Sequence, residues 1–307
     1  MTAPMTSSSA SMRDAVLAVV REARAAVPRL ALASAEEKNA ALRAMGGRLR
    51  TDRNAILSAN ARDVEVGRAA RLSAALIDRL TLTDQRLDEM IRSVEAVIEL
   101  PDPVGAVIRE WTQPNGLVIQ KVRVPLGVVG MIFESRPNVA SECGSLCVKS
   151  GNAVVLRGGA EAFRSNQAIT ASLRRALQDT GLPEAAVSTL PTADRAAVDV
   201  MLQLHDLIDV IIPRGGEALI RKVVETSRIP VIKHAKGVCH VYVDDAADLE
   251  MAQAIVLNAK CQRPATCNAM ETLLVHERVA KAFLPDCLRR LRDSGVELRG
   301  CEVTRSL

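Results

Sequence analysis

Cys267 is the residue of this sequence best placed to act as a covalent nucleophile. It lies in the loop 263–268, between a stretch with helical apolar spacing and a strand candidate, where a thiol is held without full burial. A thiolate in such a loop can attack an acyl carbon and form a covalent intermediate. A loop cysteine can also be purely structural, and the local pattern leaves both interpretations open.

A second group of candidates follows the predicted strands. Polar residues and glycines cluster where these strands end. They predict a ligand site, because ligands of doubly wound sheets bind at the carboxyl ends of the strands. The arginines could contact dinucleotide phosphates while the glycines let backbone amides approach. Solvated charges and ordinary turns are the alternatives, since no GxGxxG fingerprint follows a strand. The candidates are Ser135, Pro137, Asn138, Arg157, Gly158, Arg214, Gly215 and Gly216.

For the other polar residues, the sequence gives weaker evidence of a catalytic or metal-binding role. Lys260 and Arg263 could lower the pKa of Cys267 or receive a substrate phosphate, or could be a solvated pair. His205 and His276 are expected to be structural, whereas His234 and His240 are candidates for acid–base roles. None of the seven cysteines forms a CxxC pair, so no metal site is predicted.

The elements that must position these residues begin with a helical segment. Residues 1–11 are expected to be a disordered tail, and helical spacing continues to about residue 100. Ser34 with Glu37 predicts a capping box, and Thr83 and Asp84 are both N-cap candidates for a later helix. Residues 111–127 contain a Pro-Asn-Gly turn at 114–116 and β-rich runs at 117–119 and 122–124, which predicts an extended strand pair.

From Val128 onward, short β-branched runs alternate with helical patterns, which predicts a doubly wound, mostly parallel α/β sheet of the Rossmann type. The strand candidates are 128–134, 153–157, 187–190, 207–212 and 230–233. The intervening helices are expected at 163–178 and, after a Thr192 cap, at 193–204. A second, incomplete α/β module is expected over 244–307, with a helix, the loop 261–269, a strand 270–275 and a helix 277–293.

Composition excludes several classes of function. The net charge of +4 is spread along the chain, and one Trp, one Tyr and three Phe offer few stacking surfaces, so nucleic acid is not an expected partner. No apolar run reaches the roughly 20 residues that span a bilayer. Seven scattered cysteines do not form a secreted disulfide framework. A cytoplasmic location without membrane contact is therefore expected.

Several segments together closely resemble the signature of the gamma-glutamyl phosphate reductases, also called glutamate-5-semialdehyde dehydrogenases, of the aldehyde dehydrogenase superfamily. The longest are VPLGVVGMIFESRPNV at 124–139 and QRPATCNAMET at 262–272. Shorter ones are KSGN at 149–152, LRGG at 156–159, IPRGG at 212–216, IKH at 232–234, CHVYVD at 239–244 and NAK at 258–260. The resemblance runs from the first helices to the last residue.

The resemblance implies an aldehyde-dehydrogenase-like fold and NADPH-dependent reduction of L-glutamyl 5-phosphate to L-glutamate 5-semialdehyde and phosphate, a step of proline biosynthesis. It implies that Cys267 is the nucleophile and that Asn138 directs its amide at the developing oxyanion; a helix cap at Val139 is the alternative for Asn138. Where hydrolytic relatives carry a carboxylate base, this chain has Lys233 and His234, which favours an acyl-phosphate substrate. An extra NADPH phosphate would meet Arg157 or Arg214.

By the same resemblance, the dinucleotide-binding domain comprises 12–110 and 128–243, 111–127 is an oligomerisation hairpin, and 244–307 is a partial catalytic domain. A homo-oligomer and a functional contact with glutamate 5-kinase are expected. Relatives continue past Leu307, so the alternative function is a catalytically silent dinucleotide-binding or association module. Cys261 could form a disulfide with Cys267, or be a passive substitution.

Overall fold

The computed structural model describes residues 7–233, 237–264, 266 and 268–306. The chain forms two compact units, Met1–Lys233 and His234–Leu307. No helix among the described residues is long and apolar enough to cross a membrane.

Helices form the first part of the first unit, as the sequence predicted. They are α1 (Ser7–Ala31), α2 (Ala35–Thr51), α3 (Arg53–Ala69), α4 (Ala74–Leu80) and α5 (Asp84–Ile98). Two of the helix starts were predicted from local sequence and are confirmed. Ser34 and Glu37 form a reciprocal capping box at α2, and the Thr83 side chain caps α5. The helix α1 begins at Ser7, within the stretch 1–11 for which disorder was expected, because its apolar face, including Val16 and Val20, is fully buried.

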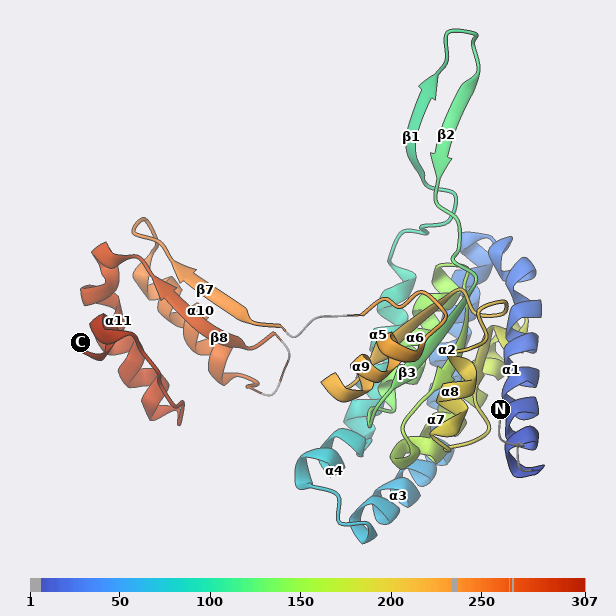
Figure 1. The fold of residues 1–307 in the computed structure, drawn as a ribbon, viewed down its shortest axis with the longest axis horizontal. Helices are drawn as coiled ribbons and strands as arrows, with labels where there is room; N and C mark the ends of the chain where they lie inside the picture. The colour runs from blue at the N-terminus through green and yellow to red at the C-terminus, as the bar shows by residue number, and fades with distance from the viewer. Residues whose placement is uncertain (1–6, 234–236, 265, 267, 307) are drawn as a thin grey trace, which may run out of the picture. The chain divides into compact units, whose positions relative to one another are not determined.

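A strand pair is present and projects from the first unit (Figure 1). Its bounds differ from the predicted range 111–127, because the residues that pair with 118–122 lie before the turn, at 107–112. Strands β1 (Val107–Thr112) and β2 (Val118–Val122) are antiparallel, and Gly116 in the connecting turn has a φ of 84°. Nearly every residue of both strands is exposed. The hairpin therefore contributes little to the core of its own unit.

A four-stranded parallel sheet forms the centre of the first unit. Its strands are β3 (Val128–Phe133), β4 (Ala153–Arg157), β5 (Val187–Thr189) and β6 (Val210–Arg214), in the order β5-β4-β3-β6. Its connections contain α6 (Asn138–Lys149), η1 (Ala160–Ala162), α7 (Phe163–Asp179), η2 (Glu184–Ala186) and α8 (Ala196–Met201), and α9 (Glu217–Thr226) follows β6. The fold is therefore the predicted doubly wound, parallel α/β class.

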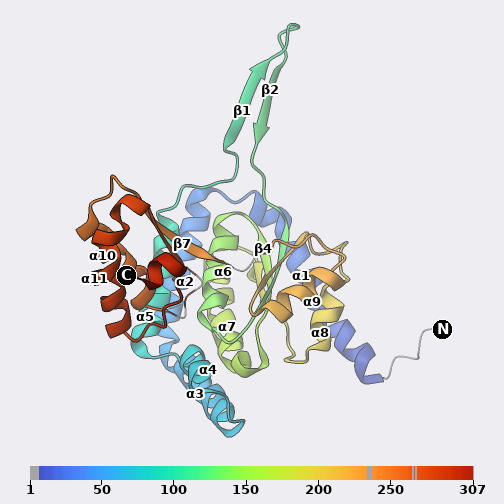
Figure 2. The same cartoon turned by 60° about the vertical axis from the view of Figure 1, so that its left-hand side comes forward.

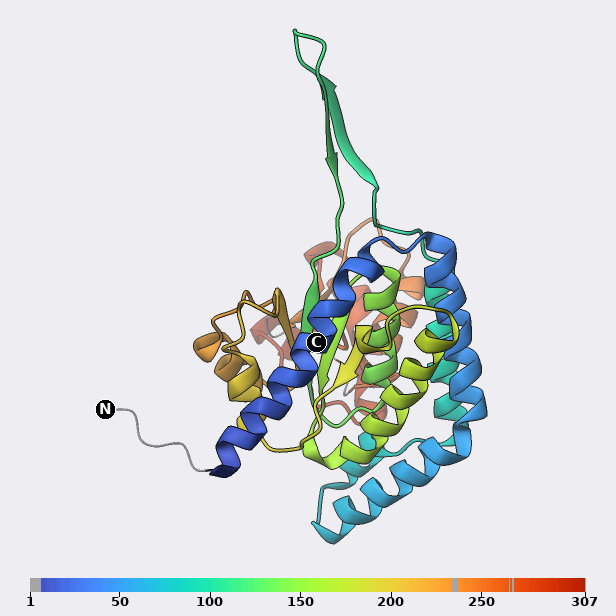
Figure 3. The same ribbon diagram turned by 90° about the vertical axis from the view of Figure 1, so that its right-hand side faces the viewer.

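Successive strand residues point to opposite faces of this sheet, as the two-residue period of a strand requires. In β4, Val154 and Leu156 belong to the core beneath α2, α5, α6 and α7, whereas Ala153 and Val155 belong to the core beneath α1 and α8. Figures 2 and 3 show these two helical layers on either side of the strands. Burial on both faces explains why these strands read as continuous apolar runs.

Three details of the predicted elements are wrong. The run 230–233 is not a strand, because only Val231 forms a bridge, to Ile211, and Pro230 has no N–H to extend a ladder. The helix expected over 193–204 is restricted to α8, and Thr192 caps a turn at Asp194 instead of that helix. The strand expected from 207 begins at Val210, because Leu207 and Ile208 bond back to Leu204 in a turn.

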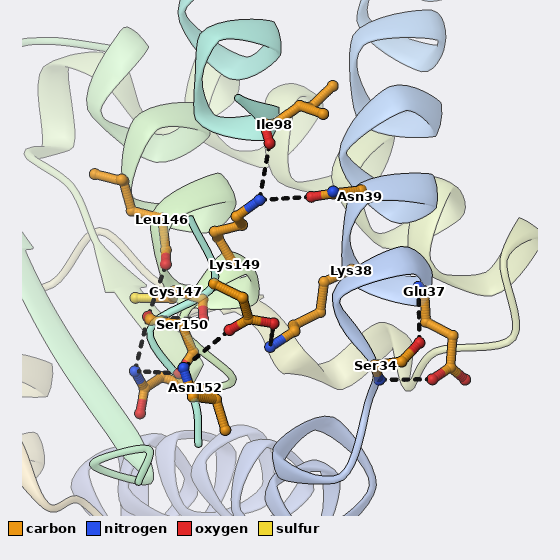
Figure 4. Close-up of polar contacts among 12 residues, drawn as sticks. Ser34, Glu37, Lys38, Asn39, Ile98, Leu146, Cys147, Lys149, Ser150 and Asn152 are labelled. Carbon is orange, nitrogen blue, oxygen red and sulfur yellow. Dashed lines mark hydrogen bonds and ion pairs between the residues drawn. The ribbon is translucent and has the colours of Figure 1, made fainter. Parts of the chain in front are cut away.

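A buried polar network lies at the amino-terminal edge of the sheet (Figure 4). The Lys38 side chain is 1% exposed, and its Nζ lies 2.5 Å from Asp102 Oδ2. Lys149 Nζ donates to Asn39 Oδ1 at 2.6 Å and to the Ile98 carbonyl at 2.9 Å. Burial lowers the pKa of Lys149. The network joins α2, the end of α5 and the end of α6 to the segment that leads into the hairpin.

The second unit is a small α/β body. It contains β7 (Cys239–Val243), α10 (Leu249–Cys261), β8 (Met270–Val275), α11 (Glu277–Asp293) and α12 (Glu302–Arg305). The strands β7 and β8 are parallel neighbours, and Val256, Phe283 and Leu291 are among the buried residues that pack with them. The predicted strand 270–275 and helix 277–293 are confirmed. The strand β7, which the sequence analysis assigned to the first domain, pairs in this second unit.

Candidate active site

The sheet register brings three of the predicted segments to one edge. Ile132 of β3 is aligned with Arg157 of β4, and Phe133 is aligned with Arg214 of β6. Because all these strands are parallel, the residues that follow them share the carboxyl-terminal edge. Ser135, Gly158 and Gly215 therefore lie on neighbouring strand ends, as the sequence predicted for a ligand site.

Ser135, directly after β3, is held by a carboxylate that the sequence analysis did not single out. Its backbone N–H and its Oγ both donate to Glu161 Oε1, at 2.7 and 2.6 Å. Ser135 is 9% exposed and has a φ of 46°, a conformation that non-glycine residues adopt rarely. The two hydrogen bonds stabilise this strained turn at the start of the loop that leads to α6.

Asn138 is the first residue of α6 and follows the N-cap residue Pro137. Asn138 is not the N-cap residue, and no side-chain capping hydrogen bond is made at this helix start in the described part of the chain, so the alternative interpretation of Asn138 as a cap is wrong. Asn138 Nδ2 instead donates to Glu142 Oε1, one turn along the same helix, at 2.7 Å. Glu142 therefore fixes the orientation of the amide group.

Arg157 ends β4 and is 8% exposed. Its Nη2 donates to the carbonyls of Ala193 and Asp194, at 3.0 and 3.3 Å, so it holds the loop that follows β5. Its buried Nε has no hydrogen-bond partner among the described residues. Burial lowers the pKa of the Arg157 guanidinium, and the nearby Glu161 opposes that shift.

The glycines after β4 and β6 differ in their surroundings. A methyl group added at Gly158 would lie 2.0 Å from Asn166 Nδ2, so Gly158 permits close packing of its loop on α7. Gly216 is the N-cap residue of α9, and its N–H donates to Glu134 Oε2 at 2.8 Å. A carboxylate oxygen at this helix N-terminus shows that the amide accommodates an anionic oxygen.

Arg214 is exposed, and within the described part of the chain its side chain makes no hydrogen bond or ion pair. The edge therefore presents the exposed guanidiniums of Arg136 and Arg214, one amide at a helix N-terminus and the glycine turns. These groups fit the phosphates of a dinucleotide. Glu134 and Glu161 were missed as site residues, because their partners lie 82 and 26 residues away in the sequence.

Cys267 lies outside the described residues, so the predicted nucleophile and its possible disulfide with Cys261 are not placed. The described residues around it form turns in the second unit, where Thr266 N donates to the Arg263 carbonyl and Ala269 N to the Thr266 carbonyl. Lys260 Nζ donates to the Met270 carbonyl at 3.0 Å, which ties the end of α10 to the start of β8. Cys261 is half-buried against the core of this unit.

The histidines and cysteines show no metal centre among the residues that the structure describes. His276 caps α11 by accepting from Arg278 N, as expected for a structural histidine. His205 Nδ1 and His240 Nδ1 each lie within hydrogen-bond distance of a nearby backbone carbonyl. His234 lies outside the described residues.

Comparisons with known proteins agree with this architecture. The model of the aldehyde dehydrogenase family matches residues 2–298. A solved gamma-glutamyl phosphate reductase from Thermotoga maritima superposes with a TM-score of 0.89 at 46% identity, covering 95% of this chain and 71% of the other. One from Saccharomyces cerevisiae superposes with a TM-score of 0.66 at 32% identity, covering 99% and 74%. The fold is that of an aldehyde dehydrogenase.

Sequence comparison gives the particular family. The gamma-glutamyl phosphate reductase of Moorella thermoacetica is 53% identical over 287 residues, which are 94% of this chain and 69% of that protein. This chain belongs to the gamma-glutamyl phosphate reductase family, within the aldehyde dehydrogenases.

Proposed function

We propose that this chain reduces L-glutamyl 5-phosphate to L-glutamate 5-semialdehyde, with release of phosphate and oxidation of NADPH, in proline biosynthesis. The observation that carries the proposal is the 53% identity to a gamma-glutamyl phosphate reductase over nearly the whole chain. The QRPATCNAMET segment with the candidate nucleophile Cys267 lies within the matched family range.

In the proposed reaction, the Cys267 thiolate attacks the acyl carbon of the substrate. The bond between that carbon and the phosphate oxygen breaks, and phosphate leaves with the electron pair. NADPH, when bound, would supply the hydride that reduces the resulting thioester. The negatively charged oxygen of the reduced intermediate then re-forms the carbonyl, the carbon–sulfur bond breaks, and the aldehyde leaves as the Cys267 thiolate is restored.

Asn138 is proposed to stabilise the oxyanion that develops when the thiolate attacks. The hydrogen bond from Asn138 Nδ2 to Glu142 Oε1 supports this role, because it fixes the amide orientation before substrate binds. Phosphate leaves without a catalytic water. The absence of a carboxylate base at Lys233 and His234 therefore agrees with an acyl-phosphate substrate.

For the coenzyme, we propose NADPH, bound by Ser135, Pro137, Arg157, Gly158, Gly215 and Gly216. Of the two arginines that could meet the additional phosphate, Arg214 is the better candidate. Arg157 already donates to two backbone carbonyls and is buried, whereas Arg214 is exposed at the strand edge. An exposed guanidinium loses fewer existing contacts on binding a phosphate.

The hairpin is proposed to form a homo-oligomer interface. A two-stranded hairpin is marginally stable by itself, and this one exposes many large apolar side chains that a partner surface would cover. These residues are Val107, Ile108, Trp111, Leu117, Val118 and Val122. A cytoplasmic location and a functional contact with glutamate 5-kinase stay predictions; co-sedimentation of the two purified proteins would test the contact.

The test of the proposed function is the reverse reaction on this 307-residue chain. Phosphate-dependent reduction of NADP⁺ by glutamate semialdehyde is measured for the wild type and for Cys267→Ala. Turnover by the wild type and none by the variant supports the thiolate mechanism. If neither turns over but NADPH still binds, the chain is the catalytically silent dinucleotide-binding module, and the reductase proposal fails.

A further inference from the structure

A buried carboxylate caps the start of α7 from a different helix. Asp63 of α3 is 1% exposed. Its Oδ2 accepts from the backbone N–H and the Oγ of Ser165, at 2.8 and 2.7 Å, and its Oδ1 accepts from the backbone N–H of Arg164 at 3.3 Å. These amides belong to the first turn of α7, whose own N-cap residue, Ala162, has no capping side chain. Asp63 therefore performs the function of an N-cap residue from 102 positions away.

Asn60, one turn earlier on α3, completes this buried cap. It is 2% exposed, and its Nδ2 donates to Ser165 Oγ at 3.1 Å and to the Leu80 carbonyl at 2.8 Å. Its Oδ1 accepts from Leu82 N at 2.7 Å. Ala162 packs against Val64 and Leu80 in a small apolar cluster beside it. The polar and apolar contacts together fix where the loop after β4 enters α7.

The first two turns of α7 touch the ends of two neighbouring strands. Asn166 lies against Gly158 after β4, and Gln167 Nε2 donates to the Leu190 carbonyl after β5 at 2.9 Å. Just before the helix, Glu161 accepts both hydrogen bonds from Ser135 after β3. The position of this helix start thus sets the position of three strand ends on the candidate coenzyme edge.

We propose that Asp63 is a positioning residue for coenzyme binding: by capping α7 it holds Glu161 against Ser135 and Asn166 against Gly158. This inference rests on the proposed function, because it takes the carboxyl-terminal edge of the sheet as the dinucleotide site. Asp63 itself touches no strand-end residue among these contacts. It acts through the α7 start.

The test compares Asp63→Asn with Asp102→Asn, an equivalent substitution in the buried ion pair at the opposite edge of the sheet. Dissociation constants for NADPH are measured by calorimetry well below the unfolding temperature of each variant. Asp63→Asn replaces one of the two accepting oxygens with an NH2 group, so part of the cap is lost. It should raise the Kd about tenfold, which corresponds to roughly 1.4 kcal/mol, the order of one lost hydrogen bond to a charged group. Asp102→Asn should lower stability while leaving the Kd unchanged.

Hydrogen exchange provides a second readout without ligand. In Asp63→Asn, the amides of Glu161, Arg164 and Ser165 should exchange faster than in the wild type and in Asp102→Asn. If Asp63→Asn does not fold, Ser165→Ala removes one donor to Asp63 and should raise the Kd about threefold. If the wild type binds no NADPH, the proposed function fails; if it binds and the folded variant binds equally well, the role of Asp63 is refuted.

Discussion

Removing the buried charge of Lys38 should destabilise the first unit, and removing the charge of its partner Asp102 as well should restore part of that stability. The Lys38 side chain is 1% exposed and that of Asp102 is 18% exposed. Replacing Lys38 by Met keeps the volume of the side chain but leaves Asp102 without its ion-pair partner. Breaking a buried ion pair from one side costs about 3–5 kcal/mol. Asp102 retains some access to water and the attraction of Lys149, so we expect about 3 kcal/mol for Lys38→Met.

The double variant Lys38→Met, Asp102→Asn distinguishes this mechanism from simple loss of packing. With both charges removed, no unpaired ion is left in the interior, so the double variant should recover about 1–2 kcal/mol relative to Lys38→Met. Urea unfolding followed by circular dichroism at 222 nm measures both, since most of the helices belong to the first unit. Additive losses from the two substitutions would refute the argument from an unpaired charge.

Three further predictions concern the helix cap, the coenzyme and the hairpin. Hydrogen bonds from the Ser34 backbone, followed by Arg29, lower the pKa of Glu37 to about 2. The capping box should thus be fully formed above pH 4.5 and be lost as the pH falls through 2. Ser34→Ala should raise the pKa of the Glu37 carboxyl, as measured by NMR titration. An unchanged Glu37 pKa in this variant would contradict the capping box. Arg214→Ala should raise the Kd for NADPH about tenfold but barely change that for NADH, and Arg221→Ala, on the following helix α9, is the control. Equal effects on both coenzymes would exclude a contact between Arg214 and the additional phosphate of NADPH. Val118→Asp should lower the mass found by sedimentation velocity, and an unchanged mass would remove the hairpin from the interface.

Local chemistry explains which elements the sequence could predict. Ser34 with Glu37 and Thr83 mark helix starts through contacts three residues apart, and β4 was predicted from its apolar run because both of its faces are covered. The run 230–233 misled the prediction because β-branched composition alone does not supply a ladder partner. Pro230 and Val231 reach only Ile211, through a single bridge.

The candidate site was only partly predictable for a similar reason. Glycines and arginines after strands are visible in a linear pattern, and the sheet register brought them together as expected. The groups that hold them are not visible, because Glu161 bonds Ser135 across 26 residues and Glu134 bonds Gly216 across 82. An acidic residue in a loop has no local signature that identifies its acceptor role. Cys267 was found only through its motif, and its geometry lies outside the described residues.

Two carboxylates near the candidate coenzyme edge occupy helix N-termini, where the partial positive charge of the helix favours an anion. Glu134 at α9 is exposed, so an incoming phosphate oxygen can compete for the Gly216 amide. Asp63 at α7 is buried and has no such competitor. A ligand phosphate can therefore replace Glu134 at the α9 N-terminus, whereas Asp63 stays bound to the α7 N-terminus whether or not a ligand is present. This difference separates the two coenzyme predictions: loss of Asp63 should already alter the loop in the ligand-free protein, whereas loss of Arg214 should alter only the affinity for a phosphate-bearing ligand.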